Sequence, residues 1–222
     1  DSLQPTLYPA VCALCGAPSP ADLDLCRDCG LELPHNRDYC RRCALPLPAS
    51  TGASVCGACH NRPPLYDRCL APLLYRPPLD RLISAMKFHG QLRYGRLLGD
   101  LLGAFVQQFQ PPAPQLIIPV PLHRARLRQR GYNQALEIAR PLSRRLGIPL
   151  ACGHLLRRHA TAAQAELEKG ERQRNVRGAF VLSRRLPVQH VALVDDVVTT
   201  GATVTELTRV LRGAGVECVQ VW

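Results

Sequence analysis

The residues best suited to chemistry in this sequence are two adjacent carboxylates, Asp195 and Asp196, which directly follow the apolar run Val191–Val194. An apolar run of this kind, followed by a short turn and a helical pattern from Ala202, predicts a buried strand that leads into a helix. Ligands of α/β folds bind at the carboxyl ends of such strands. We therefore expect the two carboxylates to line a ligand site.

The turn after the carboxylates has the features of an anion cradle. Its residues are Val198, Thr199, Thr200, Gly201, Ala202 and Thr203. Backbone N–H groups at the start of a helix point toward a bound anion, and a glycine lets the backbone approach the ligand closely. The turn lacks the lysine of a Walker loop. We expect it to hold a phosphate, and an ordinary turn between a strand and a helix is the alternative.

A sugar attached to that phosphate would lie beside Asp195 and Asp196. Carboxylates can accept hydrogen bonds from its vicinal hydroxyls, and they help to hold a hydrated Mg²⁺ ion. The sequence shows no obvious Cys-His or Ser-His pair for nucleophilic catalysis. This pattern therefore favours a site that positions a phosphorylated sugar and neutralises its charge, rather than one that attacks it with a side chain.

A second group of residues with chemical potential is the cysteines. Eight of the eleven fall within residues 12–59 as four Cys-x-x-Cys pairs. The pairs are Cys12 with Cys15, Cys26 with Cys29, Cys40 with Cys43, and Cys56 with Cys59. Two such pairs supply the tetrahedral shell of four thiolates that zinc prefers, with no position left open for catalysis. We predict two structural zinc ions on consecutive sets of four cysteines. Interleaved pairing stays open, and an iron–sulfur cluster or disulfides are weaker alternatives.

The cysteine-rich segment has two interpretations. It is either a metal staple for a segment too small to build its own core, or a docking module for nucleic acid or protein. Residues 1–30 show no signal peptide, and no run of 18 apolar residues predicts a membrane span. We therefore expect a cytoplasmic protein, in which thiols stay reduced.

Charge points to an anionic partner. The chain carries a formal charge of +11, and residues 123–158 hold nine arginines against one acid, Glu137. Such a stretch attracts phosphates, diphosphate or nucleic acid. A solvated helix face is the alternative interpretation of the same arginines.

The elements that must position these residues alternate between helix and strand. Helical spacing begins at Leu79 and returns from Leu97, whereas the proline-rich residues 61–78 indicate a link between two modules. The expected core elements are a strand at 116–118, a helix at 133–146, strands near 148–156 and at 179–182 and 188–194, a helix at 202–212 and a strand at 216–222. This alternation predicts an α/β domain with a mostly parallel sheet. We place a cysteine-rich zinc module at 1–65 and the α/β domain at 66–222.

The residues also resemble a known family. Val194–Thr203 is similar to the phosphoribosyl diphosphate signature of type I phosphoribosyltransferases. The four cysteine pairs resemble the ComF family, of the ComFC/GntX type, as do several shorter motifs. These motifs are Lys87-Phe88-His89-Gly90, Pro119-Val120-Pro121-Leu122, Arg130-Gly131-Tyr132-Asn133-Gln134, and Thr161, Gln164, Arg172 and Asn175 in that order. The resemblance covers essentially the whole chain.

The resemblance implies a type I phosphoribosyltransferase domain that binds phosphoribosyl diphosphate with Mg²⁺. It implies that Asp195 and Asp196 contact the ribose hydroxyls, that 199–203 holds the 5-phosphate, and that His123 and Arg124 are candidate diphosphate ligands. Residues 157–175 occupy the place of the mobile loop of such enzymes. The implied roles are phosphoribosyl transfer and DNA uptake or utilisation, with single-stranded DNA or DNA-uptake proteins as further partners. The alternative is a non-catalytic DNA-binding or phosphoribosyl diphosphate-sensing protein.

Overall fold

The computed structural model describes residues 10–20, 23–49, 52–159 and 176–222. Its centre is a parallel sheet with the strand order β1-β6-β5-β2. These strands are β1 (Arg68–Cys69), β6 (Cys218–Val221), β5 (His190–Val194) and β2 (Leu116–Pro119). A separate antiparallel pair joins β3 (Leu155–Arg157) to β4 (Phe180–Leu182). The mostly parallel α/β architecture predicted from the alternating pattern is confirmed.

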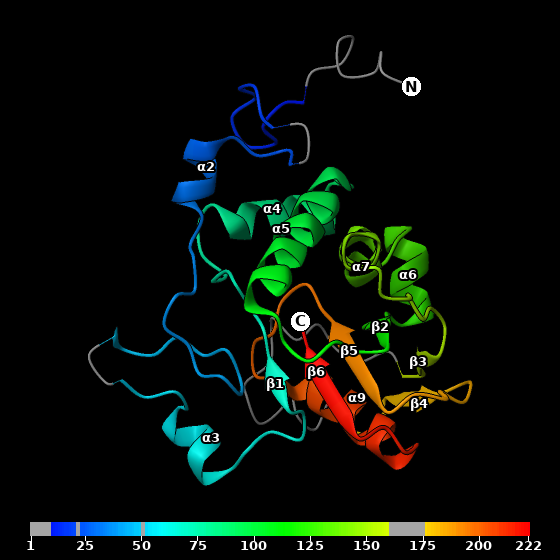
Figure 1. The fold of residues 1–222 in the computed structure, drawn as a ribbon. Helices are drawn as coiled ribbons and strands as arrows, with labels where there is room; N and C mark the ends of the chain where they lie inside the picture. The colour runs from blue at the N-terminus through cyan, green and yellow to red at the C-terminus, as the bar shows by residue number, and fades with distance from the viewer. Residues whose placement is uncertain (1–9, 21–22, 50–51, 160–175) are drawn as a thin grey trace.

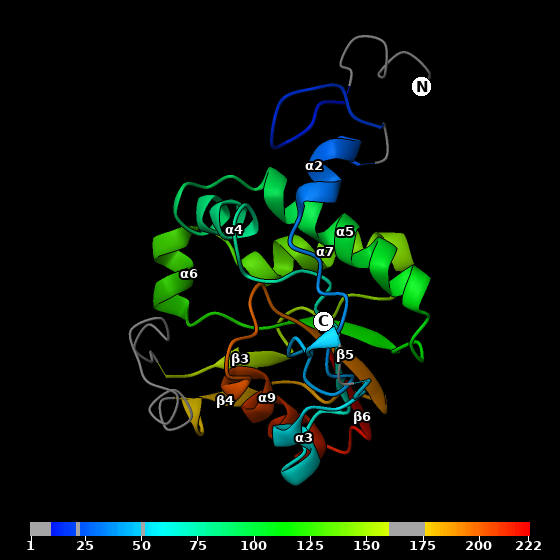
Figure 2. The same ribbon diagram turned by 90° about the vertical axis from the view of Figure 1, so that its left-hand side faces the viewer.

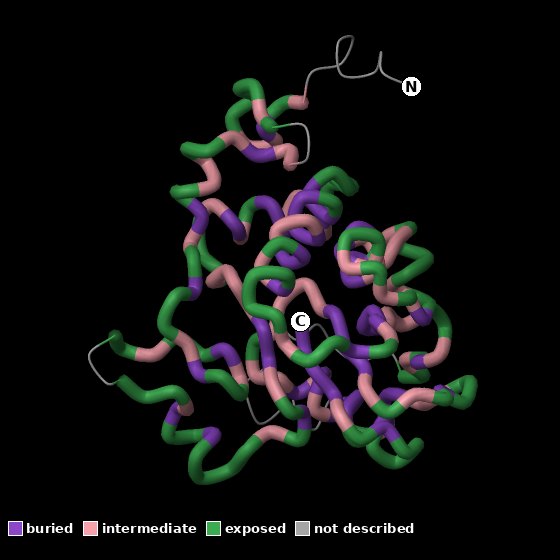
Figure 3. The backbone as a smooth tube through the Cα atoms, viewed as in Figure 1, coloured by how far each residue is buried: buried purple, intermediate pink, exposed green. Residues whose placement is uncertain are grey.

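Helices cover both faces of the parallel sheet (Figures 1 and 2). On one face lie α4 (Leu79–Phe88), α5 (Arg93–Phe109) and α7 (Gln134–Leu146). On the other face lies α9 (Ala202–Gly213). The strands alternate between the two cores, since Ile117 faces the α5 side whereas Ile118 faces the α9 side. Figure 3 shows the buried residues following these strands through the middle of the molecule.

The layer of α4, α5 and α7 is held by very close helix packing. On α5, Gly95, Gly99 and Gly103 recur every four residues and face α7. A Cβ atom at Gly99 would lie 2.3 Å from the backbone oxygen of Ile138, so only glycine allows this approach. Helix α7 in turn begins at its cap Asn133, whose side chain accepts a hydrogen bond from Ala135 N. The packing thus fixes both helices beside the sheet.

The cysteine-rich segment spreads over both sides of this domain. Its short helices α2 (Arg27–Glu32) and α3 (Gly57–Asn61) lie at opposite ends of the molecule, with α2 near α4 and α5 (Figures 1 and 2). Between them, the buried Asn36 side chain donates hydrogen bonds to Ala44 O at 2.8 Å and Ala71 O at 3.0 Å. The Asn36 side chain therefore joins the middle of the segment to the α/β domain at Ala71.

The basic stretch between β2 and α7 forms a further helix, α6 (Arg124–Arg130). It ends at Gly131, whose φ of 84° suits a residue without a Cβ atom. Strand β2, which precedes α6, pairs with β5 so that Pro119 lies opposite Val194, and Val120 N donates to Val194 O at 2.9 Å. The start of α6 is thereby placed at the same sheet edge as the residues that follow β5.

Candidate functional site

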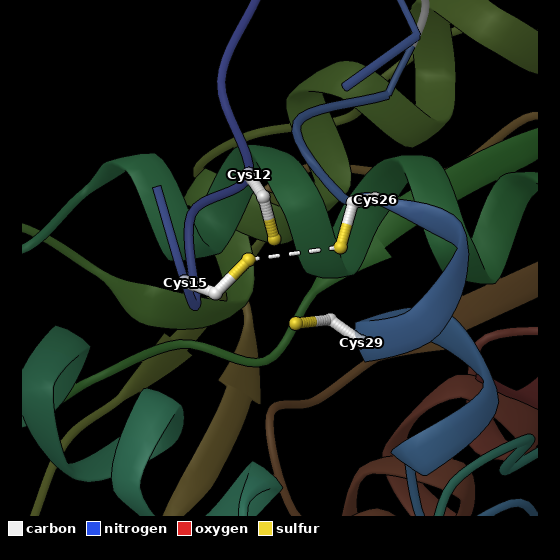
Figure 4. A group of neighbouring side chains, drawn as sticks. All are labelled: Cys12, Cys15, Cys26 and Cys29. Carbon is white, nitrogen blue, oxygen red and sulfur yellow. Dashed lines mark hydrogen bonds between the residues drawn. The ribbon is translucent and has the colours of Figure 1, made fainter. Parts of the chain in front are cut away.

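The eight paired cysteines form two groups of four. Within each group the sulfur atoms all lie within 4.8 Å of one another. The first group is Cys12, Cys15, Cys26 and Cys29, shown in Figure 4, and the second is Cys40, Cys43, Cys56 and Cys59. The structure therefore assembles consecutive pairs and not interleaved ones.

The spacing of the sulfurs fits a zinc ion. The Sγ atoms of Cys15 and Cys26 are 3.7 Å apart, and those of Cys43 and Cys56 are also 3.7 Å apart. A tetrahedral zinc site with Zn–S distances of about 2.3 Å has sulfurs separated by about 3.8 Å. These spacings are compatible with one zinc ion in each group.

The thiols also need a cation in order to ionise together. Burial disfavours the thiolate of Cys12, but backbone N–H groups of its neighbours outweigh this and lower its pKa to about 6. Hydrogen bonding to the Cys15 and Cys26 side chains raises the pKa of Cys29 instead. Neighbouring thiols therefore compete for negative charge, and a zinc ion would remove that competition.

Each cysteine group packs on a different part of the α/β domain. Cys12 of the first group shares a small core with Leu25, Leu33 and Leu97, the last of which belongs to α5. In the second group, Ala44 directly follows Cys43 and is buried in the main core on the α9 side. The second group is thus linked through Ala44 to the core that also contains Ala202 of α9.

Asp195 and Asp196 lie where the sequence predicts them, at the carboxyl end of the buried strand β5. Asp195 N donates to Trp222 O at 3.1 Å, and Asp196 N donates to the Asp195 Oδ1 atom at 2.9 Å. Burial, together with the neighbouring Asp196 carboxylate, raises the pKa of Asp195 well above its ordinary value. The structure therefore combines one half-buried carboxyl of raised pKa with a second carboxylate beside it.

The turn after these carboxylates leads directly into α9. Gly201 adopts φ 70° immediately before the helix begins at Ala202, and Ala202 N donates to Thr200 Oγ1 at 3.4 Å. A small recess at this point is lined by Asp195, Val197, Val198, Thr199, Gly201, Ala202, Thr203 and Val204. All the predicted turn residues except Thr200 line this recess. Whether they bind a phosphate stays a prediction.

Lys87 is a site residue to which the sequence assigned no role. Its ammonium group forms an ion pair with Asp196 Oδ2, although the two residues are far apart in sequence. Lys87 belongs to the Lys-Phe-His-Gly motif near the end of α4, and that helix end is also held by the Tyr132 hydroxyl, which donates to Met86 O. Two short motifs of the sequence thus meet at the end of α4, where Lys87 contacts the second carboxylate.

His123 and Arg124, the expected diphosphate ligands, stand at the start of α6. The His123 Nδ1 atom accepts a hydrogen bond from Ala125 N at 3.3 Å, so its imidazole serves as the cap of this helix. Arg124 is exposed. Contact with a diphosphate is not established for either residue and stays a prediction.

Arg157, at the end of β3, is a second cation that sequence reasoning placed only among the basic residues. Its guanidinium lies 5.5 Å from the ring centroid of Phe180. Burial lowers the pKa of Arg157, as does Arg126, whereas Asp195 acts in the opposite direction. Arg157 is therefore within electrostatic reach of the carboxylates. The motif residues Thr161, Gln164, Arg172 and Asn175 lie outside the described residues.

A larger and mostly apolar cavity also adjoins the carboxylates. Its lining comes mainly from the segment after β1, from α4 and α5, and from Trp222, and it includes Asp195 and Asp196. Apolar walls next to a charged site keep water away from it and strengthen electrostatic interactions there. The apolar lining of this cavity contributes to the partial burial of Asp195.

No helix in the described part of the chain has the length and apolar character needed to cross a membrane.

Comparison with known proteins accounts for both parts of the structure. A family model described as a double zinc ribbon domain matches residues 3–60. A second, described as a phosphoribosyl transferase domain, matches residues 133–222. The two-zinc and phosphoribosyltransferase-domain expectations therefore agree with separate family models.

Similar proteins match most of the chain. Competence protein F of Haemophilus influenzae is 40% identical over 177 residues, which cover 77% of this chain and 77% of that protein. The DNA utilization protein YhgH of Escherichia coli strain K12 is 39% identical over 173 residues, 75% of each chain. A hypoxanthine/guanine phosphoribosyltransferase of Methanosarcina barkeri is 31% identical over 86 residues, 39% of this chain and 44% of that protein. On the strength of the first two matches, this chain belongs to the ComF family.

Proposed function

We propose that this chain binds phosphoribosyl diphosphate together with Mg²⁺. The 5-phosphate occupies the turn at 199–203, and the ribose hydroxyls meet Asp195 and Asp196. The observation that carries the proposal is the position of both carboxylates at the end of β5, immediately before a glycine turn that starts α9. A helix N-terminus favours a phosphate, and the adjacent carboxylates suit the attached sugar.

The residues present fit a magnesium ion. Mg²⁺ prefers oxygen ligands and commonly binds through one or two carboxylates, several waters and the phosphates of a substrate. Asp195 and Asp196 supply the carboxylates, while Lys87 balances the charge of Asp196. When bound, the ion would neutralise charge on the diphosphate group. Lys87 and Arg157 add positive charge to the same region.

Transfer of the phosphoribosyl group is the reaction that this site could perform. Displacement of diphosphate from ribose develops positive charge on the sugar and needs no nucleophile from the protein. Asp195 and Asp196 orient the ribose, and His123, Arg124 and Arg157 are the residues proposed to hold the leaving diphosphate. The apolar cavity beside the carboxylates limits access of water to the sugar. We therefore propose a phosphoribosyltransferase.

A role with DNA is supported by other observations. Two relatives carry the names Competence protein F and DNA utilization protein. Arg124, Arg126 and Arg128 stand on α6 beside the proposed site. We propose single-stranded DNA or DNA-uptake proteins as further partners of a cytoplasmic protein. A DNA-binding or phosphoribosyl diphosphate-sensing protein without turnover is the second candidate function, and those names favour the role with DNA.

Calorimetric titration of phosphoribosyl diphosphate with Mg²⁺ tests the site. Asp195→Asn combined with Asp196→Asn keeps shape and removes two carboxylates. Charge-assisted hydrogen bonds contribute roughly 1.5–3 kcal/mol each, so binding should weaken about tenfold or more. Thr200→Val removes one hydroxyl and keeps the backbone cradle, so a smaller loss is expected.

The matched control is Glu32→Gln with Asp38→Asn, which removes two negative charges from exposed positions of the cysteine-rich segment. Its affinity should equal that of the wild type. A folded Asp195/Asp196 double variant that binds as tightly as the wild type would overturn the proposal. Turnover with a panel of bases, with and without single-stranded DNA, then separates the transferase from the sensor.

A further inference from the structure

Phe88 is the most exposed of the large apolar side chains in the described part of the chain, with 71% of its surface accessible. A single exposed apolar side chain is normal for a soluble protein and by itself has no meaning. Its position is what matters here. Phe88 directly follows Lys87, whose ammonium group contacts Asp196.

The backbone that presents Phe88 is firmly held. Helix α4 buries Leu79, Leu82, Ile83 and Met86 in the core, which fixes the helix on the sheet. At its end, the Tyr132 hydroxyl donates to Met86 O. A binding surface on this helix end would therefore be largely preorganised, which reduces the entropy lost on binding.

A planar cation lies against the Phe88 ring. The guanidinium carbon of Arg130 is 5.6 Å from the ring centroid. Arg130 Nη1 also donates to the Gln134 Oε1 atom at 2.7 Å, and Gln134 is only 2% exposed. That bond restrains the guanidinium. Burial lowers the pKa of Arg130, and Asp196 opposes that shift, which places Arg130 within electrostatic reach of this carboxylate.

We propose that Phe88 and Arg130 form a platform on which a planar heteroaromatic base stacks beside the carboxylates. Aromatic rings and arginine guanidinium planes are the two side-chain surfaces on which nucleobases stack. As the acceptor site, this inference rests on the proposed function, because a base held here would lie next to the ribose that Asp196 binds. The base is either a free nucleobase or an unpaired base of a single strand.

The chain offers a matched control for this platform. Arg68 lies over the ring of Phe109 at 5.7 Å, and Phe109 is 39% exposed. This pair has the same two side-chain types at nearly the same distance, but its ring stands at the end of α5 and also stacks on Phe105. Phe109→Leu therefore reports the loss of a partly exposed ring that is paired with an arginine at another place in the fold.

The test measures the affinity of the zinc-loaded protein for three probes. They are free adenine, an oligothymidylate of about 12 nucleotides, within the usual length of single-strand sites, and an abasic oligomer of the same length. Phe88→Leu should weaken binding of whichever base-containing probe the platform holds, adenine or the oligothymidylate, about tenfold. Binding of the abasic oligomer should change by less than about twofold, because its backbone charge is unaffected. Phe88→Trp keeps an aromatic surface and should bind the base-containing probes as tightly as the wild type. Phe109→Leu should also bind them like the wild type.

The three probes distinguish a free base from a base within a strand. Adenine binding that depends on Phe88 identifies a free base as the ligand, whereas dependence confined to the oligothymidylate identifies a base within a strand. The platform is overturned if Phe88→Leu binds the oligothymidylate like the wild type, if the abasic oligomer loses affinity equally, or if the wild type binds neither base-containing probe. Titration of phosphoribosyl diphosphate into the wild type tests the proposed function separately, since that measurement involves no base.

Discussion

The hydroxyl oxygen of Tyr66 lies 3.5 Å from the point that a Cβ atom of residue 201 would occupy, so Tyr66 supports the turn at Gly201 from the side. Tyr66 is 4% exposed and shares its core with Ala44, the residue after Cys43. The turn proposed to hold phosphate is therefore supported by the chain that directly follows the second cysteine group.

The first prediction concerns Gly201 itself. Gly201→Ala forces a side chain into φ 70°, a conformation that costs about 1–2 kcal/mol for most residues. If the turn relieves this strain by leaving its phosphate-binding shape, phosphoribosyl diphosphate should bind about five- to thirtyfold more weakly. Gly147→Ala is the control, because Gly147 has φ 67° and open space around it. Gly147→Ala should lose about as much stability as Gly201→Ala but should keep the wild-type affinity for phosphoribosyl diphosphate. Thermal unfolding measures the stability, and calorimetry measures the affinity.

Single substitutions of the two carboxylates should change stability in opposite directions. The folded state raises the pKa of Asp195, so the unfolded chain ionises more readily above the ordinary carboxyl pKa and stability falls as pH rises. Asp195→Asn removes this cost and should raise the melting temperature at neutral pH. Asp196→Asn leaves Lys87 without its carboxylate partner and should lower the melting temperature. Each kcal/mol corresponds to about 2–4 °C for a chain of this size. Thermal unfolding in magnesium-free buffer measures the two changes in melting temperature. Changes in the same direction would contradict the different roles of the two carboxylates.

The contact between α5 and α7 predicts a large effect of one methyl group. Gly99→Ala would place a Cβ atom 2.3 Å from Ile138 O, where a backbone atom must move. Overpacking of this kind costs about 1–3 kcal/mol. Gly213→Ala, at the end of α9 with open space around it, should be neutral or stabilise by up to about 1 kcal/mol. Denaturant unfolding of both variants measures the contrast.

The two cysteine groups should differ in what their loss disturbs. The wild type should carry about two zinc ions, and Cys15→Ser and Cys40→Ser about one each. Cys40 is 0% exposed and its group adjoins the core through Ala44, whereas Cys15 is exposed. We expect Cys40→Ser to weaken hydrogen-exchange protection of β1 and α9, and Cys15→Ser to spare both. Equal loss of protection in the two variants would contradict this difference.

His190 should make stability depend on pH. Burial lowers its pKa, and its Nε2 atom is 2.8 Å from Gln220 Nε2. Because the Gln220 Oε1 atom accepts from Trp222, the Gln220 amide must donate to a neutral imidazole. A lowered pKa gives stability that is present above about pH 6.5 and lost as pH falls through the folded-state pKa. His190→Gln should show less of this loss between about pH 7.5 and about pH 5.5. The quantity to compare is the difference from the wild type, since acid also weakens thiolate sites.

Local patterns were enough to predict much of the architecture. The strand predicted at 188–194 is β5, and the helix predicted at 202–212 is α9, because an apolar run and a helical spacing are visible without partners. The helix predicted at 133–146 is α7, which continues through Pro141. The four Cys-x-x-Cys pairs likewise indicate their metal sites, since all ligands of a site come from two short turns.

Features that depend on distant partners were not predictable. Strand β1 lies within residues 61–78, which we expected to be a link, and it is a strand only because it pairs in parallel with β6. Helix α6 is rich in arginine and buries no residue, so it has no apolar stripe to reveal it. The ion pair of Lys87 with Asp196 joins α4 to the end of β5, and neither segment alone indicates it.

The strand order has a consequence for how the protein is made. Strand β6 lies between β1 and β5, yet it is the last of the four strands in sequence. During synthesis, β1 therefore has no neighbour in the sheet until β6 has emerged from the ribosome, and the loop between them spans most of the α/β domain. Closing so long a loop is slow and leaves apolar surface exposed in the meantime. The cysteine groups can bind zinc as soon as their own residues emerge, so the metal sites would be formed before the central strand arrives.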